Sequence, residues 1–365
     1  MKPLFKLSLL LVALALPMSA CAAQEDSPLL PPPSDTATLG ATPTAQPPSP
    51  TASPKPPAVY RGTNFSPRSF DGPDFLRFFD EAAQVGNIVS WSGPWPQLAE
   101  LPRGAPSVIG QLAAQKGLNY MIQSAYPVKK DVQAPRIADE ATKAAYLASL
   151  KAFVERFKPR YVALGVEINN YDADRRAVFD ELVALFPAVA DTVHAASPET
   201  KVLTIFQLEI MKGLRGGLFG GKNDPATAQW ELLQLFPKAD VIGFTTYPSI
   251  IFKDPSEMPD DYYTEISKHT PKPVVFTEIG WLAGAAIPGW ESSEQEQAAF
   301  VTRFKEMVAP LNPQVLLYSF LYDPPATALP LAFDKIGLMR ADGTPRPAWE
   351  VWRHRRRLAR RGDPS

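Results

Sequence analysis

Eight short apolar runs, separated by stretches of helical periodicity, constrain the fold of this 365-residue chain more than any other feature. The runs cover residues 60–65, 87–91, 119–123, 161–167, 202–207, 241–247, 274–278 and 315–322. Each has the length and apolar content of a buried strand. Strands that alternate with helices build a parallel sheet, and eight of them close a barrel. We therefore predict an α/β fold, a single (β/α)8 TIM barrel domain over residues 59–358. An open doubly wound sheet would show a similar alternation.

Helices are predicted between these runs. They cover residues 73–85, 105–116, 139–157, 175–196, 225–235, 259–268, 293–308 and 347–358. The start of the seventh is marked by Ser-Ser-Glu-Gln-Glu at 292–296, which fits a capping box. In that motif a serine hydroxyl caps free amides, and an acid or amide three residues later reaches back to the main chain. No second Pro-rich break follows residue 60, so one domain is the simpler interpretation.

The first 20 residues have the build of an export signal. Basic residues precede an apolar stretch at 9–16 that is too short to cross a bilayer as a stable helix. Small residues then lead to Cys21, the only cysteine, at a position that resembles the lipid-acceptor site of bacterial lipoproteins. We predict a lipid anchor on Cys21 and a location in the bacterial cell envelope. Cleavage at Ala20 or Ala23 by an ordinary signal peptidase would instead give a secreted or periplasmic soluble protein.

Residues 21–58 change abruptly to Pro, Ser, Thr and Ala. Such a stretch buries too little surface to offset its ordering entropy, so we predict a disordered tether between the membrane anchor and the barrel. Residues 359–365 are predicted as a basic disordered tail. The arginine-rich segment 353–361 would contact anionic lipid or simply end the last helix in solvent. Because the net charge is only −1, we expect no nucleic-acid partner. We also expect a monomer.

Polar and aromatic residues gather where the predicted strands end. They are Asn64, Trp91, Gln123, Tyr126, Glu167, Gln207, Glu209, Tyr247, Glu278, Tyr322 and Asp323. In a (β/α)8 barrel the carboxyl ends of the strands carry the active site. Glu167 and Glu278 each finish a buried run, and a pair of carboxylates is what hydrolysis of a glycosidic bond requires. Each alone has a plain alternative: an ion pair of Glu167 with Arg68 or Lys212, and a helix cap or surface charge for Glu278.

Three segments around these residues carry a family resemblance. Leu-Gly-Val-Glu-Ile-Asn-Asn at 164–170 resembles the fourth strand of clan A glycoside hydrolases, most closely the endo-β-1,4-galactanases. Asp-Val-Ile-Gly-Phe-Thr-Thr-Tyr-Pro at 240–248 resembles their sixth strand, and Val-Phe-Thr-Glu-Ile-Gly-Trp at 275–281 their seventh. Residues 337–348 are similar to the close of such barrels. The resemblance implies retaining hydrolysis, with Glu167 as the acid/base and Glu278 as the nucleophile.

One position departs from the family pattern. The family places Asn directly before the acid/base, and here that residue is Val166. The Asn ordinarily bonds the substrate 2-hydroxyl, a contact that strengthens in the transition state. Its loss would slow hydrolysis or change the sugar accepted, unless Asn169 or Asn170 compensates from the loop.

Six residues are predicted to contact a carbohydrate: Trp91, Asn169, Gln207, Tyr247, Trp281 and Tyr322. The reason is that flat aromatic faces at strand ends can stack on sugar rings, while a few polar groups fix orientation. Tyr247 also stands where it can donate a hydrogen bond to Glu278. Trp95 and Trp290 would serve equally well as loop anchors.

The remaining motifs do not indicate a cofactor or metal. The Gly-x-x-x-x-Gly-Lys spacing at 216–222 matches a phosphate-binding loop, but Asn223 stands where Ser or Thr would bind magnesium. We expect a mobile loop over the rim of the cleft instead. His194, His269 and His354 lie too far apart to suggest a metal site, and no G-x-S-x-G esterase motif occurs.

Two functions remain in contention at this point. The first is a retaining, cofactor-free glycoside hydrolase-like protein that acts on a β-linked poly- or oligosaccharide at the cell envelope. The second is a catalytically weak or inactive carbohydrate-binding TIM-barrel lipoprotein, which Val166 favours. A third hypothesis is an unrelated barrel enzyme that uses Glu209, a carboxylate two residues beyond Gln207.

Overall fold

The computed structural model describes residues 59–128, 132, 134–171, 173–284, 287–325 and 333–353. The predicted export signal, the anchor at Cys21 and the tether lie outside the described residues. So do the last predicted helical turns and the basic tail, from residue 354 onward.

Within the described residues, nine strands form one sheet in which every hydrogen-bonded pair is parallel. They are β1 (Tyr60–Asn64), β2 (Ile88–Pro94), β3 (Asn119–Ala125), β4 (Tyr161–Leu164), β5 (Lys201–Leu203), β6 (Ile205–Gln207), β7 (Ile242–Thr246), β8 (Val274–Ile279) and β9 (Val315–Tyr318). Their order in the sheet is β5-β4-β3-β2-β1-β9-β8-β7-β6. Every predicted strand is therefore present, and the one predicted at 202–207 is split into β5 and β6.

The barrel closes through a single residue, Thr204. β5 and β6 stand at the two ends of the strand order, yet only Thr204 separates them along the chain. The Thr204 hydroxyl donates to the carbonyl of Leu164 (2.7 Å), and the Thr204 carbonyl accepts from the Gly243 amide (3.1 Å). One residue thus connects the β4 side of the sheet to the β7 side. The (β/α)8 barrel prediction is confirmed.

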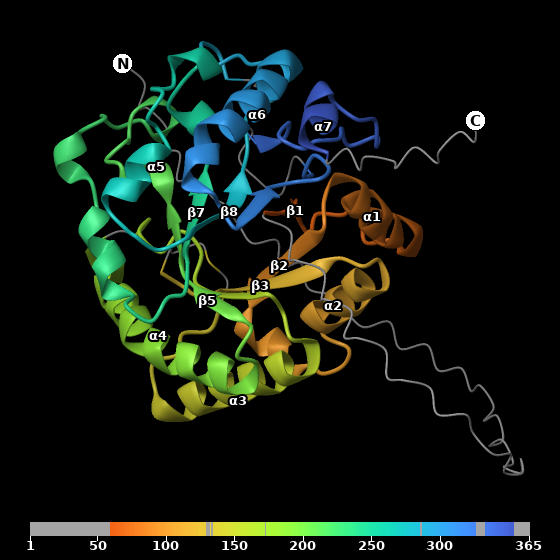
Figure 1. The fold of residues 1–365 in the computed structure, drawn as a ribbon, viewed down its shortest axis with the longest axis vertical. Coiled ribbons are helices and arrows are strands. Elements are labelled where there is room, and N and C mark those ends of the chain that lie inside the picture. The colour runs from red at the N-terminus through yellow and green to blue at the C-terminus, as the bar shows by residue number, and fades with distance from the viewer. Residues whose placement is uncertain are drawn as a thin grey trace, which may run out of the picture. The chain divides into compact units, whose positions relative to one another are not determined.

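Helices lie around the strands (Figure 1). The α-helices are α1 (Gly72–Val85), α2 (Ala105–Gln115), α3 (Glu140–Phe157), α4 (Arg176–Ala196), α5 (Leu208–Met211), α6 (Glu294–Val308) and α7 (Pro347–Trp352). The 3-10 segments are η1 (Trp95–Ala99), η2 (Ala173–Arg175), η3 (Gly217–Phe219), η4 (Pro225–Thr227), η5 (Trp230–Leu235), η6 (Pro248–Ile250), η7 (Pro255–Glu257), η8 (Thr264–Lys268) and η9 (Ala309–Leu311). Ser293 and Glu296 form the predicted capping box of α6.

The helices predicted at 225–235 and 259–268 are wrong. The structure has only short 3-10 segments there, because tertiary bonds take main-chain groups that a helix would use. The amide of Gln229 donates to the carbonyl of Met211 (2.8 Å), and the carbonyl of Tyr262 accepts from Lys212 Nζ (3.0 Å). Local periodicity is overridden where the loops above β6 and β7 are tied to each other.

Apolar side chains fill the barrel interior below the carboxyl ends of the strands. They are Tyr60, Ile88, Met121, Tyr161, Ala163, Leu203, Ile205, Val241, Val275, Val315 and Leu317. Because side chains alternate along a strand, the next inward position lies two residues later. After Ile88, Met121 and Leu317 that position holds a polar residue (Ser90, Gln123 and Ser319). The interior is thus apolar at one end and polar at the other.

Across the described ranges, no helix combines the length and the apolar character that crossing a bilayer requires.

Candidate active site

Three consecutive residues at the end of β7 each donate a hydroxyl to a different carboxylate. Thr245 Oγ1 lies 2.9 Å from Glu167 Oε1, and Thr246 Oγ1 lies 2.8 Å from Glu209 Oε1. The Tyr247 hydroxyl lies 2.7 Å from Glu278 Oε2. Alternation sends Thr245 and Tyr247 to one face of the strand and Thr246 to the other. Two of the acids therefore share the inward face of β7, and Glu209 lies behind it.

Glu167 is delivered by an unusual backbone turn rather than by the strand itself. β4 ends at Leu164, three residues earlier than predicted, and both Gly165 (φ 78°) and Glu167 (φ 51°) are left-handed. A Cβ at Gly165 would lie 2.4 Å from the side chain of Ile168, so the turn needs glycine there. A left-handed glutamate is strained, and such residues concentrate at functional sites. The turn leaves the Glu167 side chain 1% exposed.

Glu278 lies within β8 and is aimed by irregular pairing. The register of β8 shifts against both neighbours, between Phe244 and Thr245 on β7 and between Phe276 and Ile279 against β9. Such irregularities re-aim side chains near active sites. The Glu278 side chain is partly exposed.

The two glutamates meet across Thr245 and Tyr247. Thr245 pairs directly with Glu278 in the β7–β8 ladder, where neighbouring strands lie about 4.8 Å apart, and its hydroxyl reaches Glu167. The pKa of Tyr247 is raised well above its ordinary value, first by burial, then by the charge of Glu278 and also by that of Glu167. Both carboxylates therefore lie within electrostatic reach of one phenol, at the carboxyl ends of the strands.

A cluster of inward polar side chains, which we call the amide cluster, consists of Asn64, Ser90 and Gln123. Gln123 Nε2 donates to Ser90 Oγ (2.6 Å) and to Asn64 Oδ1 (3.3 Å), and Asn64 Nδ2 donates to the carbonyl of Thr277 (2.9 Å). Gln123 Oε1 is buried and has no hydrogen-bond partner in the part of the chain that the structure describes. Since Thr277 precedes Glu278, the cluster adjoins the strand that carries the predicted nucleophile.

The sequence drew attention to Asn64 and Gln123 but missed Ser90, Thr245 and Ser319. Ser319 Oγ lies 2.7 Å from the Tyr247 hydroxyl. These residues can be found from the alternation of side chains along a strand, because each lies two positions beyond an inward-facing residue of the same run.

Asn169 and Gln207, which the sequence analysis predicts as substrate-binding residues, are hydrogen-bonded to each other in the structure. The Gln207 amide donates to Asn169 Oδ1 (2.8 Å), and Asn169 Nδ2 donates to the Gln207 carbonyl (3.1 Å) and to Gln229 Oε1 (2.9 Å). The side chain of Gln207 accepts from the Ile210 amide (2.6 Å) and donates to Glu209 (2.6 Å). Both residues are buried, and their polar atoms are taken up by protein partners.

Three of the predicted aromatic contacts, Trp91, Trp281 and Tyr322, lie in the packing behind the sheet. Trp91 is 4% exposed and belongs to the core between strands and helices, because its neighbour Ser90 takes the inward position. Trp281 stacks on Phe300 of α6 with 5.1 Å between ring centroids. The hydroxyl of Tyr322 donates to Glu81 of α1. In each case the side chain packs toward the helix layer. Tyr247 is also buried, and its hydroxyl lies between Glu278 and Ser319.

Trp95 and Trp290 act as loop anchors. The Trp95 indole donates to the carbonyl of Pro135 (3.3 Å), and the Trp290 indole donates to the carbonyl of Ser249 (2.6 Å). The Trp290 ring lies against Gly217 of η3, where φ is 56° and a Cβ would meet the carbonyl of Ile250 at 2.1 Å. The glycine-rich segment 216–222 is thus packed onto the loops that follow β7 and β8. One aromatic that the sequence analysis overlooked, Phe320, is partly exposed and packs on the cluster that contains Tyr247.

The two basic residues that were proposed as ion-pair partners of Glu167 pair with other acids. Arg68 pairs with Asp74 (2.6 Å), and Lys212 pairs with Glu265. Glu209, the third carboxylate, is fully buried.

A separate charged cluster, the Arg346 cluster, ties the loop after β9 to the starts of α6 and α7. Arg346 is buried and makes two bonds to Asp323, both 2.7 Å, and one to Glu294 (3.1 Å). Arg340 also bonds Glu294. Although burial pushes the pKa of Glu294 up, the two arginines hold it below its ordinary value.

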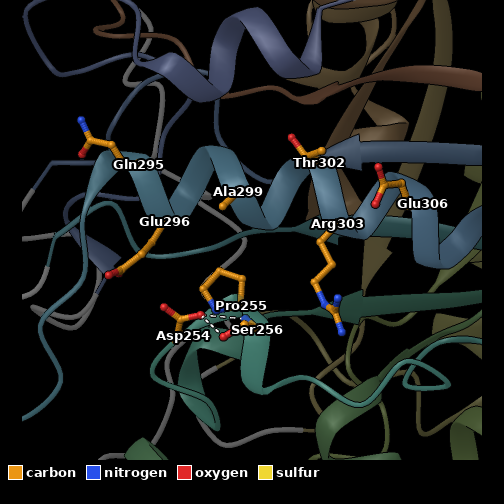
Figure 2. A pocket seen from close by; sticks show the side chains of 9 residues that line it. All are labelled: Asp254, Pro255, Ser256, Gln295, Glu296, Ala299, Thr302, Arg303 and Glu306. Atoms are coloured by element: carbon orange, nitrogen blue, oxygen red, sulfur yellow. Dashed lines mark hydrogen bonds between the residues drawn. The ribbon is translucent and has the colours of Figure 1, made fainter.

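A hollow of about 550 Å³ lies between α6 and η7 (Figure 2), and its lining includes none of Glu167, Glu209 and Glu278. Its lining side chains are largely used locally: Arg303 bonds Asp260 (2.8 Å), Asp254 caps η7, and Glu296 completes the capping box. Nothing in it duplicates the acid pair. Among the described residues, no group of three or more His, Cys, Asp or Glu side chains is arranged to hold a metal ion.

Neither a protein-family model nor a curated protein sequence matches the chain. Solved structures do match. The exo-β-1,4-mannosidase Op5Man5 from Opitutaceae bacterium strain TAV5 aligns with a TM-score of 0.59 at 15% identity, over 80% of this chain and 58% of that one. Xylanase 10B from Thermotoga maritima aligns with a TM-score of 0.57 at 13% identity, over 81% and 94%. This chain has the fold of the TIM-barrel glycoside hydrolases.

The GH53 catalytic domain from Ignisphaera aggregans aligns with a TM-score of 0.55 at 16% identity, over 82% of this chain and 97% of that one. The predicted resemblance to clan A is therefore confirmed at the level of the fold. The chain spans only 58% of the mannosidase and 62% of a family 39 glycoside hydrolase from Bacteroides cellulosilyticus WH2, so activity does not carry over with the fold.

Proposed function

We propose that this protein is a retaining glycoside hydrolase that acts on a β-linked poly- or oligosaccharide. Glu167 is the acid/base and Glu278 the nucleophile. The observation that carries the proposal is Thr245, which pairs with Glu278 in the ladder and bonds Glu167 through its hydroxyl. Two acids that adjoin one residue at the carboxyl end of a barrel are arranged for chemistry on a single glycosidic bond.

In the first step, a carboxylate oxygen of Glu278 attacks the anomeric carbon while Glu167 gives its proton to the departing glycosidic oxygen. In the second step, Glu167 takes a proton from water, the water oxygen attacks the same carbon, and the bond to Glu278 breaks. The hydrogen bond from Tyr247 favours the ionised form of Glu278. The Thr245 hydroxyl holds the carboxyl group of Glu167, which gives up its proton in the first step.

The amide cluster supplies what Val166 cannot. Val166 packs on the apolar interior, so it offers nothing to a sugar hydroxyl. Asn64 is partly exposed and sits beside the Glu278 strand, and it takes the role of the missing amide in this proposal. Phe320 supplies the apolar face on which a sugar ring stacks.

The test is incubation with a panel of β-glycans and aryl β-glycosides, with the anomer of the first product followed by NMR. We expect hydrolysis with net retention, and its loss in Glu278→Gln. Glu306→Gln, an exposed glutamate on α6, is the matched control and should hydrolyse as the unmodified protein does. Inverted product would replace the nucleophile assignment by a general-base one.

The competing function is a carbohydrate-binding barrel without turnover. The apolar Val166 and the 1% exposure of Glu167 favour it. Saturable binding of a glycan by calorimetry, with no hydrolysis by protein at high concentration, would establish this alternative. Val166→Asn separates the two further: if activity rises, the valine is a loss of function, whereas a fall shows a cleft built around it.

We also propose that the enzyme is held at the bacterial cell envelope by a lipid on Cys21. Metabolic labelling with a fatty-acid analogue in a bacterial host should mark the protein and fail for Cys21→Ser, which should leave the membrane fraction. Equal fractionation of the two would contradict the anchor.

A further inference from the structure

Glu209 is a buried carboxylate that the proposed reaction does not use. It lies in α5, immediately after β6, on the side of β7 away from Glu167 and Glu278. It is fully buried, and burial raises its pKa against the hydrogen bonds that oppose the rise. A buried acid without a cationic partner is costly, so a chain that keeps one gains something from it.

Four donors converge on this carboxylate. Oε1 accepts from the hydroxyls of Tyr262 and Thr246, each at 2.8 Å. Oε2 accepts from Gln207 Nε2 (2.6 Å) and from the main-chain amide of Tyr247 (3.3 Å). The amide groups can only donate, so Oε2 must act as an acceptor. None of the four donors is basic.

These bonds link the two halves of the proposed site. On one side, Gln207 is tied to Asn169, two residues beyond Glu167 on the same loop. On the other side, the Tyr247 amide belongs to the residue whose phenol bonds Glu278. Glu209 bonds both Gln207 and Tyr247, so it connects the two sides of this path. A shift of its carboxylate would move the loop that carries Glu167 and the donor that serves Glu278.

We propose that Glu209 is a positioning residue, which fixes the main chain of Tyr247 and the side chain of Gln207 so that Tyr247 reaches Glu278 and the Glu167 loop stays in register. The proposal rests on the proposed function of Glu167 and Glu278. It replaces the third hypothesis from the sequence, because a fully buried carboxylate whose two oxygens each accept two bonds, behind β7, is not presented to a substrate.

A double-mutant cycle between Glu209→Met and Tyr247→Phe tests the proposal. Methionine keeps the length of the side chain but accepts none of the four bonds. We expect Glu209→Met to lower kcat about 10- to 100-fold with little change in KM, since small displacements of catalytic groups have effects of that size. In the Tyr247→Phe background the same substitution should lower kcat by a clearly smaller factor, because the part exerted through the Tyr247 phenol is already lost and only the part exerted through Gln207 on the Glu167 loop remains. Effects that simply multiply would overturn the proposal.

Tyr120→Phe is the matched control. Its phenol is also buried in the outer layer and donates to one carbonyl, that of Pro106 (2.9 Å), on β3 far from β7 along the sheet. Its loss should lower the denaturation midpoint without lowering kcat and without coupling to Tyr247→Phe.

Glu209→Gln is the second variant. It keeps the shape of the side chain and the acceptor for Gln207 and Tyr247, so it should fold even if Glu209→Met does not. Glu209→Gln should show the same coupling to Tyr247→Phe, with a smaller magnitude. If Glu209→Gln shows no coupling to Tyr247→Phe, that result also contradicts the positioning role.

A second readout does not depend on activity. With ¹³C-labelled glutamate, the carboxyl of Glu278 is titrated by NMR and assigned by its loss in Glu278→Gln. Tyr247→Phe should raise the pKa of Glu278, because a donor to the charged form is lost. Glu209→Met should raise it too, and Tyr120→Phe should not.

The two readouts separate two failures. If no glycan is hydrolysed but Glu209→Met moves the Glu278 titration, the positioning stands and the glycosidase proposal falls. If hydrolysis occurs and neither the cycle nor the titration responds to Glu209, the positioning falls alone.

Discussion

Two clusters of acids, on neighbouring parts of the same barrel, are built in opposite ways. In the Arg346 cluster, Asp323 and Glu294 are bound by arginine, and the pKa of Glu294 is held below its ordinary value. At the end of β7, hydroxyl groups bind the carboxylates, and the pKa of Glu209 is raised by burial. Arginine fixes an acid as a permanent anion and thereby fastens loops. Hydroxyl donors hold a carboxyl group in place and leave its proton affinity open to tuning.

The comparison separates acids that fasten loops through arginine from acids that lie in or beside the proposed active site. A bidentate arginine pair gives strength and direction, and it suits the Asp323 loop, which must connect β9 to α6 and α7. A neutral donor such as Tyr247 adds direction without a full opposing charge. Substitutions in the Arg346 cluster should therefore lower stability, whereas substitutions at the end of β7 should lower activity.

The largest effect on activity is expected at Glu278. Glu278→Gln removes the attacking carboxylate, so kcat should fall at least about 10⁴-fold, as it does when a nucleophile is removed. The denaturation midpoint should change little, since the residue is partly exposed. If Asp323→Asn abolished turnover to the same degree while leaving stability intact, the division between the clusters would be wrong.

The largest effect on stability is expected at Arg346. Arg346→Met leaves Asp323 and Glu294 without their shared cation, and breaking a buried pair in this way costs about 3 to 5 kcal/mol. Urea denaturation measures the loss, and kcat per folded molecule should stay near that of the unmodified protein. A fall in kcat at full folding would bring the Arg346 cluster into the chemistry.

Tyr247→Phe should have an intermediate effect. Loss of one hydrogen bond to a charged group costs about 1.5 to 3 kcal/mol, which corresponds to about 10- to 100-fold in kcat. The acid limb of the pH profile of kcat/KM should move to higher pH, because the ionised form of Glu278 loses its donor. An unmoved limb would mean that another group titrates there.

The smallest effect is a pair of opposite pH dependences of stability. Glu294 has a lowered pKa in the folded state, so its stabilisation is present above the unfolded pKa and is lost as pH falls through the folded value. Glu209 has a raised pKa, so its stabilisation is present below the unfolded pKa and is lost as pH rises through the folded value. Denaturation should be measured from pH 3 to 8. As pH rises, the free energy of unfolding of Glu294→Gln should fall relative to that of the unmodified protein, and that of Glu209→Gln should rise relative to it. Parallel curves would refute the contrast.

The strands could be predicted from the sequence because they depend on local apolar runs, and the two proposed acids follow from the ends of those runs. The face to which each aromatic side chain points could not be predicted in this way. At the end of β2, a one-residue difference decides whether Ser90 or Trp91 faces inward, and the inner face of each strand is set by the whole barrel. Glu278 is aimed by a register shift, and Glu167 by a left-handed turn three residues beyond its strand. Asn169 and Gln207 pair across 38 positions, a contact that no local pattern announces.

The three hydroxyl donors Thr245, Thr246 and Tyr247 are consecutive residues at the end of β7. Their spacing is set by the repeat of an extended chain, about 3.3 Å per residue, and not by the lengths of the surrounding loops. Replacing the segments above the rim would then alter which ligand is admitted while the spacing between the acids is inherited unchanged. For anyone who wishes to redirect this barrel toward a different ligand, the connections are the part to exchange and the seventh strand is the part to keep.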